Sequence, residues 1–467
     1  MKPSIISVIT EGECASLTGA AFQIIEEFGV LVTHAEAVEL LLGAGARRAG
    51  DGRIRIEEGL ARELVARAPS RFSLHDRSGG SIEIGSGRCW TICGGTVSRV
   101  LQWPELSVRP ATRSDVARFA RLCDGLPLVH CVVPLVEAQD VERSRAEVVT
   151  FMETLAHTTK FVLVCPVEHA SARAFVEMAR IATRQQDLSM EPKVGLLATL
   201  LPDLRLDDHC ASTLILAARE GVPLIAMGGS LTGCSCPNTV AASAVSKAAS
   251  ELFLVALAEL ARPGTPVLVD LGAFTLDMNE ADLGEAGPEY PLSVAALAQV
   301  ARSLGLPTYS CALHCEAKTG DFQAGLEKMA GMLTCLLARV DLTCNLGMLS
   351  RCSMASYEQL VLDHELCAFV DRFGRGVRVD EDTLAMDVVR EVGLGGDYLA
   401  HEHTVRHCRS GEIWYPRLLD RTSVGAPARE LYERAHAEAE RILRTHDPAV
   451  EPHVRDELTS FADRWAQ

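Results

Sequence analysis

The stretch "FVLVCPVEHASARAFVEMARIATRQQDLSMEPKVGLLA" (161–198) holds one complete strand–helix–strand unit. Short apolar runs at 161–165 and 193–198 flank an amphipathic stretch at 169–184. A strand, a crossover helix and a second strand in this order predict parallel pairing with a right-handed connection. The class of the fold then depends on how often the unit repeats.

The same unit recurs along most of the chain. Apolar runs typical of buried strands lie at 89–93, 128–134, 161–165, 193–198, 223–227, 266–271, 307–313 and 341–346. Amphipathic stretches typical of helices lie at 114–124, 142–157, 169–184, 206–219, 239–261, 291–304, 322–338 and 354–371. Eight such units favour an α/β fold, an eight-stranded parallel (β/α)8 TIM-type barrel. An open doubly wound sheet is the alternative.

Helical sections flank the predicted barrel on both sides. Residues 1–80 combine two helical patterns with a hairpin pattern around Ser-Gly-Gly at 78–80. Residues 376–467 carry short helical patterns and end in a charged helix. We therefore expect a helical N-terminal section with a hairpin at 1–80, the barrel at 81–375, and a helical C-terminal section at 376–467 packed on the barrel.

Charge and composition exclude several classes of partner. The net charge of −17 argues against nucleic acids and anionic membranes, which bind clustered lysine and arginine. We see no uninterrupted apolar run long enough to cross a bilayer and no signal-peptide pattern. The sixteen cysteines are dispersed along a long chain, which is typical of a reduced, cytoplasmic protein whose thiols are buried apolar side chains or metal ligands.

The most polar strand end is the seventh, in "CALHCEAK" (311–318). In an eightfold barrel the chemistry is found at the carboxyl ends of the strands. We predict His314, Cys315 and Glu316 as catalytic residues at this mouth. A buried imidazole and thiol need a ligand, a metal or each other as partners.

Five further residues are candidates for substrate binding. Phe274 and Tyr309 lie near strand ends, where aromatic rings attract cations, although core packing is the alternative. Asp277 lies in the loop beyond the sixth strand, and Lys318 is suited to a carboxylate or to proton transfer, with a solvated ion pair as the alternative. His403 shares a helix face with His407 in "HEHTVRHC" (401–408), for which a packing role is favoured over metal binding.

A zinc site is a further possibility at the mouth. Cys234 and Cys236 form a Cys-x-Cys pair in the glycine-rich loop "GGSLTGCSCPNT" (228–239) after the fifth strand. Such a pair chelates one zinc ion, and Cys315 from another strand end would supply a third thiolate. Burial of these thiols as small apolar side chains is the alternative.

Several strings in their order resemble the trimethylamine methyltransferase family, a methanogenesis-type family of barrel enzymes. They are "IIEEFGVLV" (24–32), "APSRFSLHDRSG" (68–79), "CGGTVSRVL" (93–101), "DFQAGLEK" (321–328), "ASYEQLVLDHEL" (355–366) and "GGDYLAHEHTVRHCRSGEIWYPRLLDR" (395–421). The resemblance implies a methyltransferase that moves a methyl group from a small methylated compound to the cobalt of a corrinoid (cobalamin), which a separate corrinoid protein supplies. It also implies a homo-oligomer, a dimer or a trimer.

This chain departs from the family pattern at one position that bears on the substrate. Founding members of the family carry pyrrolysine near the end of the seventh strand, around residues 313–315 here, and this chain has none. It therefore resembles the non-pyrrolysine branch, related to glycine betaine:corrinoid methyltransferases, and a quaternary amine such as a betaine is the favoured donor. The alternatives are a zinc-thiolate barrel methyltransferase for a thioether, thiol or methoxy donor, and a catalytically silent barrel that serves as a scaffold.

Overall fold

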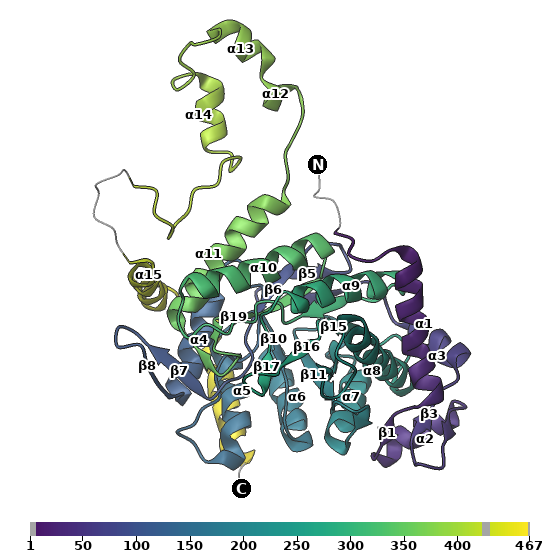
Figure 1. Cartoon of the computed structure of the whole chain (residues 1–467). Helices are drawn as coiled ribbons and strands as arrows, with labels where there is room; N and C mark the ends of the chain where they lie inside the picture. Colours follow the sequence, from purple (N-terminus) through teal and green to yellow (C-terminus); the bar gives the residue numbers. More distant parts are fainter. Residues whose placement is uncertain (1–5, 423–429, 466–467) are drawn as a thin grey trace.

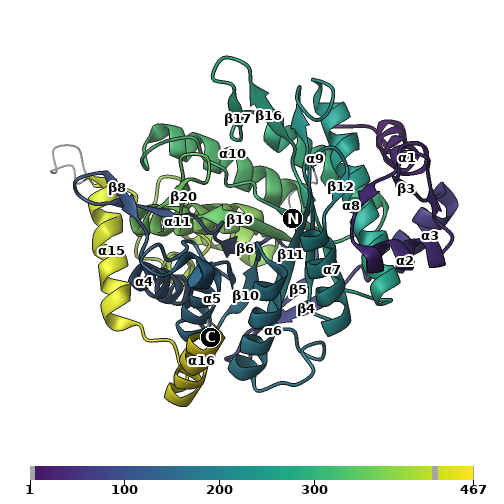
Figure 2. The same ribbon diagram turned by 90° about the horizontal axis from the view of Figure 1, so that it is seen from below.

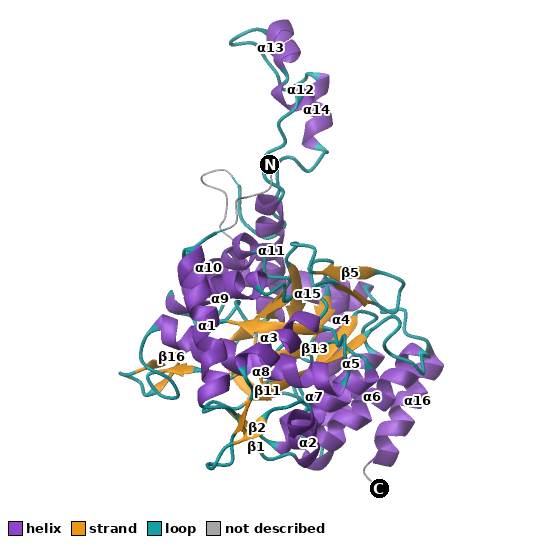
Figure 3. Cartoon of the chain, turned by 90° about the vertical axis from the view of Figure 1, so that its right-hand side faces the viewer, coloured by secondary structure: helices purple, strands orange, loops and turns teal. Residues whose placement is uncertain are grey.

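The computed structural model describes residues 6–422 and 430–465, and eight parallel strands close a barrel at its centre. The strands lie in the interior and helices surround them (Figure 3). Around the barrel their order is β6 (Trp90–Cys93), β9 (Cys131–Val132), β10 (Phe161–Val164), β11 (Val194–Leu200), β13 (Leu224–Gly228), β15 (Val267–Leu271), β18 (Thr308–Ser310) and β19 (Leu342–Leu346). The closed barrel is confirmed, and each predicted strand overlaps one of these eight.

Nearly continuous burial explains why the strands read as apolar runs. Along β15, Val267 and Val269 pack in the core between the sheet and the helices, whereas Leu268 faces the barrel interior. Successive side chains of a strand alternate between its two faces, so both faces must be apolar where both are covered. The parallel register is regular, with Leu224 opposite Val267 and Ala226 opposite Val269.

A helix follows each barrel strand. These helices are α4 (Arg113–Gly125), α5 (Ala146–Ala156, preceded by a 3-10 turn at Arg143–Arg145), α6 (His169–Thr183), α7 (Asp208–Glu220), α8 (Val240–Ala261), α9 (Glu289–Ser303), α10 (Phe322–Ala338) and α11 (Tyr357–Gly374). Local capping fixes where they begin. For α4, the Thr112 hydroxyl accepts from the Asp115 amide and the Asp115 carboxylate accepts from the Thr112 amide, which satisfies two amides that a helix leaves free.

The N-terminal section covers one side and one end of the barrel. It comprises α1 (Glu11–Glu27), β1 (Leu31–Val32), α2 (Ala35–Gly43), β2 (Arg47–Arg48), β3 (Ile54–Arg55), α3 (Glu58–Arg67), β4 (Phe72–His75) and β5 (Ser81–Ile84). Helices α1, α2 and α3 pack against α8. The β4–β5 hairpin places Leu74 and Ile84 in the interior cluster of the barrel, and β5 leads directly into β6, so the hairpin closes the amino end of the barrel.

Helix α8 is apolar along its length, and most of it is buried. Among the described residues it is the one helix that is long and apolar enough to cross a membrane by length and composition. Of its most apolar stretch, 72% is buried inside the protein. The helix lies between β13 and β15 on one side and α1, α2 and α3 on the other. A helix that is apolar all round is expected in such a position in the core of a large protein.

Smaller strands build up the carboxyl end of the barrel. A three-stranded sheet of β14 (Leu231–Thr232), β16 (Phe274–Asp277) and β17 (Asp282–Gly284) follows the fifth and sixth barrel strands. A second sheet joins β7 (Arg99–Gln102), β8 (Ser107–Pro110), β20 (Met348–Leu349) and β21 (Met354–Ala355), and β12 (Arg205–Leu206) pairs with β1. These additions supply the loops that surround the mouth.

The C-terminal section has two parts that differ in packing. Helices α15 (Leu431–Thr445) and α16 (Pro452–Trp465) pack on the barrel helices, the first against α4 and α11 and the second against α5 and α6 (Figure 2). Helices α12 (Glu381–Leu384), α13 (Met386–Val392) and α14 (Glu402–Cys408) instead form an arm, residues 376–412, that extends away from the body (Figure 1). Unlike α15 and α16, the arm contributes no buried residue.

Candidate active site at the carboxyl end of the barrel

A cavity of about 380 Å³ opens at the carboxyl end of the barrel. Its walls come from the ends of most barrel strands and from α5, and they include Thr96, Glu137, Glu147, Phe151, Cys165, Thr199, Met227, Tyr309, Cys311, His314, Asn345 and Cys352. No lysine or arginine is among the described residues that line it. A cavity with acidic and aromatic walls at this end of a barrel is the natural candidate for the active site.

His314 is the most constrained polar residue in the cavity wall. Its Nδ1 lies 3.0 Å from Glu285 Oε2, 3.1 Å from Asn345 Nδ2 and 3.4 Å from Cys352 Sγ. His314 is only 5% exposed, and its Nε2 has no hydrogen-bond partner among the residues that the structure describes. Burial on its own lowers the pKa of His314, but Cys352, Cys311 and Glu285 outweigh it and raise that pKa well above the usual value.

Thiols surround this imidazole. Cys352 Sγ lies 3.3 Å from Asn345 Nδ2, and burial raises the pKa of Cys352 although His314 opposes the rise. Cys311 lies beside Tyr309, with its Sγ 3.6 Å from the phenol oxygen. A hydrogen bond with Cys344 and burial raise the pKa of Cys311 well above its usual value. These two thiols are therefore protonated at neutral pH in the absence of a cation.

Two aromatic rings fix the orientation of His314. Phe274 and Tyr290 approach it edge-on, with ring centroids 5.2 and 5.0 Å away. The hydroxyl of Tyr290 donates to the Leu271 carbonyl at the end of β15. The imidazole is thus held between a ring from β16 and a ring from the start of α9, which leaves it little freedom to rotate.

The backbone near the site is held in unusual conformations. Asn345 has φ of +80°, and Ser350, Arg351 and Cys352 have φ of +54°, +54° and +50°. The three consecutive left-handed residues turn the β20–β21 connection back toward His314. Side chains other than glycine adopt this region at a cost, and such residues cluster at functional sites.

Two buried lysines fix the loops of the mouth. Lys328 on α10 is fully buried and donates to the carbonyls of Leu313 and Asn345 and to Asp363 Oδ2 at 2.8 Å. Lys247 on α8 donates to the Gly228 carbonyl and to Asp270 Oδ2 at 2.6 Å. Lys328 therefore ties the residue before His314 to Asn345, and Lys247 ties the ends of β13 and β15 together.

The three residues predicted to be catalytic separate in space. His314 lines the cavity, whereas Cys315 is buried in a small apolar cluster with Leu349 and Tyr432 and does not line it. Burial raises the pKa of Cys315 to about 12. Glu316 Oε1 accepts from the Glu285 amide at 2.8 Å, so its carboxylate holds the loop that carries Glu285.

The five residues predicted to bind substrate also lie in different places. Tyr309 lines the cavity and Phe274 packs on His314. Asp277 accepts from the Asn279 amide in the turn after β16, and Lys318 is exposed and donates to Ser350 Oγ at 2.8 Å. His403 is on the arm, with its Nε2 2.9 Å from the Asp382 carbonyl oxygen.

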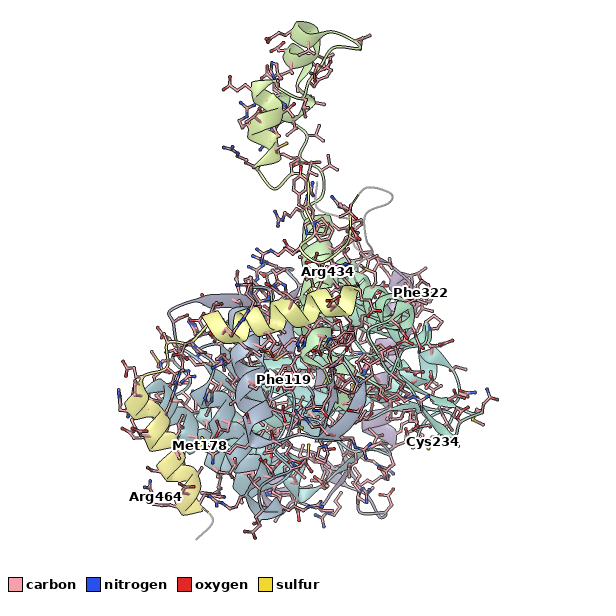
Figure 4. The ribbon with its side chains drawn as sticks, turned by 90° about the vertical axis from the view of Figure 1, so that its left-hand side faces the viewer. Phe119, Met178, Cys234, Phe322, Arg434 and Arg464 are labelled. Carbon is pink, nitrogen blue, oxygen red and sulfur yellow. The ribbon has the colours of Figure 1, made fainter. Side chains whose placement is uncertain are left out.

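The structure does not assemble the zinc site predicted from the thiols. Cys234 is exposed at the surface of the body (Figure 4), Cys236 borders a separate cavity beside α1, and Cys315 is buried elsewhere. Within residues 6–422 and 430–465, groups of three possible ligands occur at Glu285–His314–Cys352 and at Asp382–His403–His407. The Cys-x-Cys loop turns outward because β14 carries it away from the barrel axis to pair with β16.

Sequence reasoning did not single out Glu285 or Asn345 as site residues. Glu285 follows the short strand β17, far along the chain from the end of β15, and has no local signal apart from its charge. Cys352 was visible as a thiol in the loop after the eighth strand. Its meeting with His314 depends on a left-handed turn at residues without glycine, which sequence patterns do not predict.

Three comparisons with known proteins give one consistent result. A family model described as trimethylamine methyltransferase (MTTB) matches residues 2–467. The chain is 27% identical over 463 residues to a glycine betaine methyltransferase of Desulfitobacterium hafniense, covering 97% of this chain and 96% of that protein. It is 28% identical to a trimethylamine methyltransferase of Methanosarcina barkeri, covering 98% and 95%.

The fold also resembles a solved structure. The crystal structure of the monomethylamine methyltransferase of Methanosarcina barkeri superposes with a TM-score of 0.52 at 11% sequence identity. The match covers 97% of this chain and 92% of that one. At this identity the likeness concerns the fold alone.

Proposed function

The chain belongs to the trimethylamine methyltransferase family, and we propose that it moves a methyl group from a small methylated ammonium compound to the cobalt of a separate corrinoid protein. Relatives named for trimethylamine and for glycine betaine support a methylated amine as the donor. A quaternary or protonated amine is positively charged, so the cavity must accept a cation.

The walls of the cavity are the observation that carries this proposal. Glu137 and Glu147 supply negative charge, Tyr309 and Phe151 supply aromatic rings, and no lysine or arginine lines the cavity among the described residues. A cleft lined by one sign of charge attracts ligands of the opposite sign. Aromatic faces add a cation–π attraction of about 0.5 to 2 kcal/mol for a partly desolvated cation.

The protein's part in the reaction is to bind and orient the donor. A donor seated against Tyr309 presents a methyl group toward the open end of the barrel, where the corrinoid protein docks. The reduced cobalt supplies the nucleophile when that partner is bound. Fixed walls hold the methyl carbon in line for attack, and such positioning contributes strongly to rate enhancement.

Methyl transfer to free cob(I)alamin tests this proposal directly. The purified chain is mixed with a panel of methylated amines and betaines, and methylcobalamin formation is followed by visible absorption. We expect Glu137→Gln to raise KM for the active donor at least about tenfold, because it removes a charge that faces a cation. Glu39→Gln, an exposed residue on α2, is the matched control and should behave as wild type.

Failure of every donor would contradict the proposal and favour the scaffold alternative. In that case the chain would bind a corrinoid protein without promoting transfer. A zinc-dependent reaction on a thioether, thiol or methoxy donor is the second candidate function. Its supporting observation is the group of Glu285, His314 and Cys352 at the cavity wall.

We also propose that the protein is a homo-oligomer in which the arm packs on a second copy. The arm has no buried residue, and Leu394 and Leu399 are 95% and 79% exposed. The arm leaves the body after α11. The last residue of α11, Gly374, lines the same cavity as Gly87, which lies just before the start of β6. The arm therefore begins at the amino end of the barrel, opposite the mouth where the corrinoid protein would dock.

The remaining expectations concern location and other partners. We expect a cytoplasmic protein without nucleic-acid or membrane partners. The net charge of −17 and the burial of α8 support this expectation. Fractionation of cells that express a tagged full-length chain would test it. Recovery in the membrane fraction after a high-salt wash would contradict it.

A further inference from the structure

We propose that Glu285, His314 and Cys352 bind one zinc ion whose open coordination position faces the mouth cavity. The three ligands come from three different connections, those after β17, β18 and β20. None of them belongs to the Cys-x-Cys pair that the sequence suggested. Three separate observations support this site.

The first observation is the spacing of the ligand atoms. One ligand atom from each residue lies within 4.8 Å of the other two. His314 Nδ1 is 3.0 Å from Glu285 Oε2 and 3.4 Å from Cys352 Sγ. Zinc bonds of about 2.0 to 2.3 Å in a tetrahedron separate two ligand atoms by about 3.3 to 3.7 Å. The two separations from His314 Nδ1 thus lie within a few tenths of an ångström of those in a tetrahedron, and the Glu285 and Cys352 ligand atoms lie within 4.8 Å of each other.

The second observation is the unsatisfied bonding capacity of the group. Glu285 is 6% exposed, and its Oε2 makes no well-directed hydrogen bond to any described residue, despite the close imidazole. Asn345 Nδ2 lies within 3.3 Å of three acceptors at once: Cys311 O, Cys352 Sγ and His314 Nδ1. An amide nitrogen has two hydrogens and cannot satisfy all three of these atoms. Zinc would displace the protons of His314 Nδ1 and Cys352 Sγ on binding, and the two atoms would then coordinate it together with Glu285.

The third observation is the support around the ligands. The rings of Phe274 and Tyr290 hold the imidazole, and Glu316 holds the backbone amide of Glu285. Groups that orient metal ligands in this way raise affinity and fix geometry. This gives Glu316 a positioning role.

The donor set selects the ion. One nitrogen, one sulfur and one carboxylate oxygen suit zinc, whereas magnesium and calcium require oxygen ligands. Three protein ligands leave a fourth position for a small molecule, as in catalytic zinc sites. His314 and Cys352 line the cavity, so that position opens into it.

The ligand class follows from the chemistry of the open position and rests on the proposed function. A quaternary nitrogen has no lone pair and cannot bind zinc. A carboxylate or hydroxyl group of the same donor can bind it, and no lysine or arginine among the described lining residues competes for that group. The site therefore selects a zwitterionic methylated donor, with its anionic end on the ion and its ammonium end on the acidic and aromatic wall.

Metal analysis of the full-length chain tests the site without reference to activity. The chain is stripped with a chelator, incubated with zinc or cobalt(II), desalted and measured by elemental analysis and visible absorption. We expect about one ion per chain and, with cobalt(II), a thiolate-to-metal charge-transfer band. Cys352→Ser and Glu285→Gln should each weaken binding at least about tenfold and, for Cys352→Ser, remove the band.

Matched variants separate this site from other thiols and histidines. Cys165→Ser removes a thiol that lines the same cavity, and the Cys234→Ser, Cys236→Ser double variant removes the Cys-x-Cys pair. His403→Ala removes a histidine from the ligand group on the arm. All three should retain the ion with unchanged stoichiometry. Loss of the ion in the double variant, or an unchanged affinity and charge-transfer band in Cys352→Ser, would overturn the proposal, as would a wild-type chain that binds no ion.

The two proposals fail in distinguishable ways. A chain that transfers methyl groups at the same rate after complete removal of metal, and that does not take up zinc, overturns the zinc site only. A chain that holds one ion through Cys352 but methylates no cobalamin from any donor overturns the proposed function only. Equal KM values for betaines and for methylamines without a carboxylate, with the ion bound, overturn the assigned ligand class.

Discussion

The barrel and the arm each contain a group of three possible metal ligands, and the two groups differ in their access to water. At the barrel mouth, Glu285 and His314 are buried and Cys352 is half-buried. Asp382, His403 and His407 are partly exposed on the arm, where His407 Nε2 lies 3.3 Å from Asp382 Oδ2 and ties α14 to α12. The Asp382 carboxylate is open to water, whereas the Glu285 and His314 side chains are almost completely shielded from it. A histidine beside a carboxylate therefore indicates a binding site more strongly where solvent is excluded.

The same contrast applies to apolar side chains. In the barrel, apolar residues of every strand are buried. On the arm, Leu384, Leu394 and Leu399 are exposed in the single chain. Three short helices without a core gain too little from burial to offset the entropy of ordering them. The arm consequently needs a partner surface, whereas the barrel is stable through its own contacts.

The largest difference is expected when one charge is removed from each region. Lys328→Met leaves Asp363 as an unpaired buried carboxylate, which should cost about 3 to 5 kcal/mol of unfolding free energy. Arg406→Met breaks an exposed ion pair with Asp382 on the arm and should cost under about 1 kcal/mol. Urea unfolding followed by circular dichroism measures both. Equal losses would contradict the contrast between the two regions.

A pH series sharpens the comparison within the barrel. Burial raises the pKa of Asp115, but hydrogen bonds from Arg109, Thr112 and Tyr357 outweigh it and lower that pKa to about 2. A carboxylate whose pKa is lower in the folded chain stabilises the fold above its unfolded pKa and loses this effect as the pH falls toward 2. Asp115→Asn should therefore cost about 2 kcal/mol at pH 7 and progressively less below pH 4.

Unfolding midpoints of wild type and Asp115→Asn between pH 7 and pH 3 measure this effect. Asp382→Asn on the arm is the matched control, and we expect its difference from wild type to stay small throughout. A difference for Asp115→Asn that is constant with pH would show that packing, and not charge, accounts for the loss.

The smallest effect on subunit stability is expected at the exposed leucines of the arm. Leu394→Glu with Leu399→Glu should change unfolding free energy of the subunit by no more than about 0.5 kcal/mol. The same change should abolish self-association, because it places charges in the proposed contact. Analytical ultracentrifugation at micromolar concentration measures the state, with Met190→Glu, an exposed residue before β11, as the control. An unchanged oligomeric state would show that the arm does not contribute to self-association.

Local patterns in the sequence determined the barrel. All eight barrel strands and the helices that follow them begin and end within about four residues of their predicted bounds. Apolar runs and helical periodicity are properties of neighbouring residues, and parallel units connected by right-handed crossovers allow few closures. The family resemblance, carried by strings spread over the chain, is confirmed by the match over residues 2–467.

Tertiary structure decided which residues form the site. His314 and Cys315 are adjacent in sequence, yet the first lines the cavity and the second packs in an apolar cluster. Glu285 and Cys352 reach His314 from connections after other strands, through a small added sheet and a left-handed turn. Neighbouring residues determine whether a segment is a strand or a helix. Closure of the barrel and the path of each loop determine which side chains meet, and these depend on contacts between residues far apart in the chain.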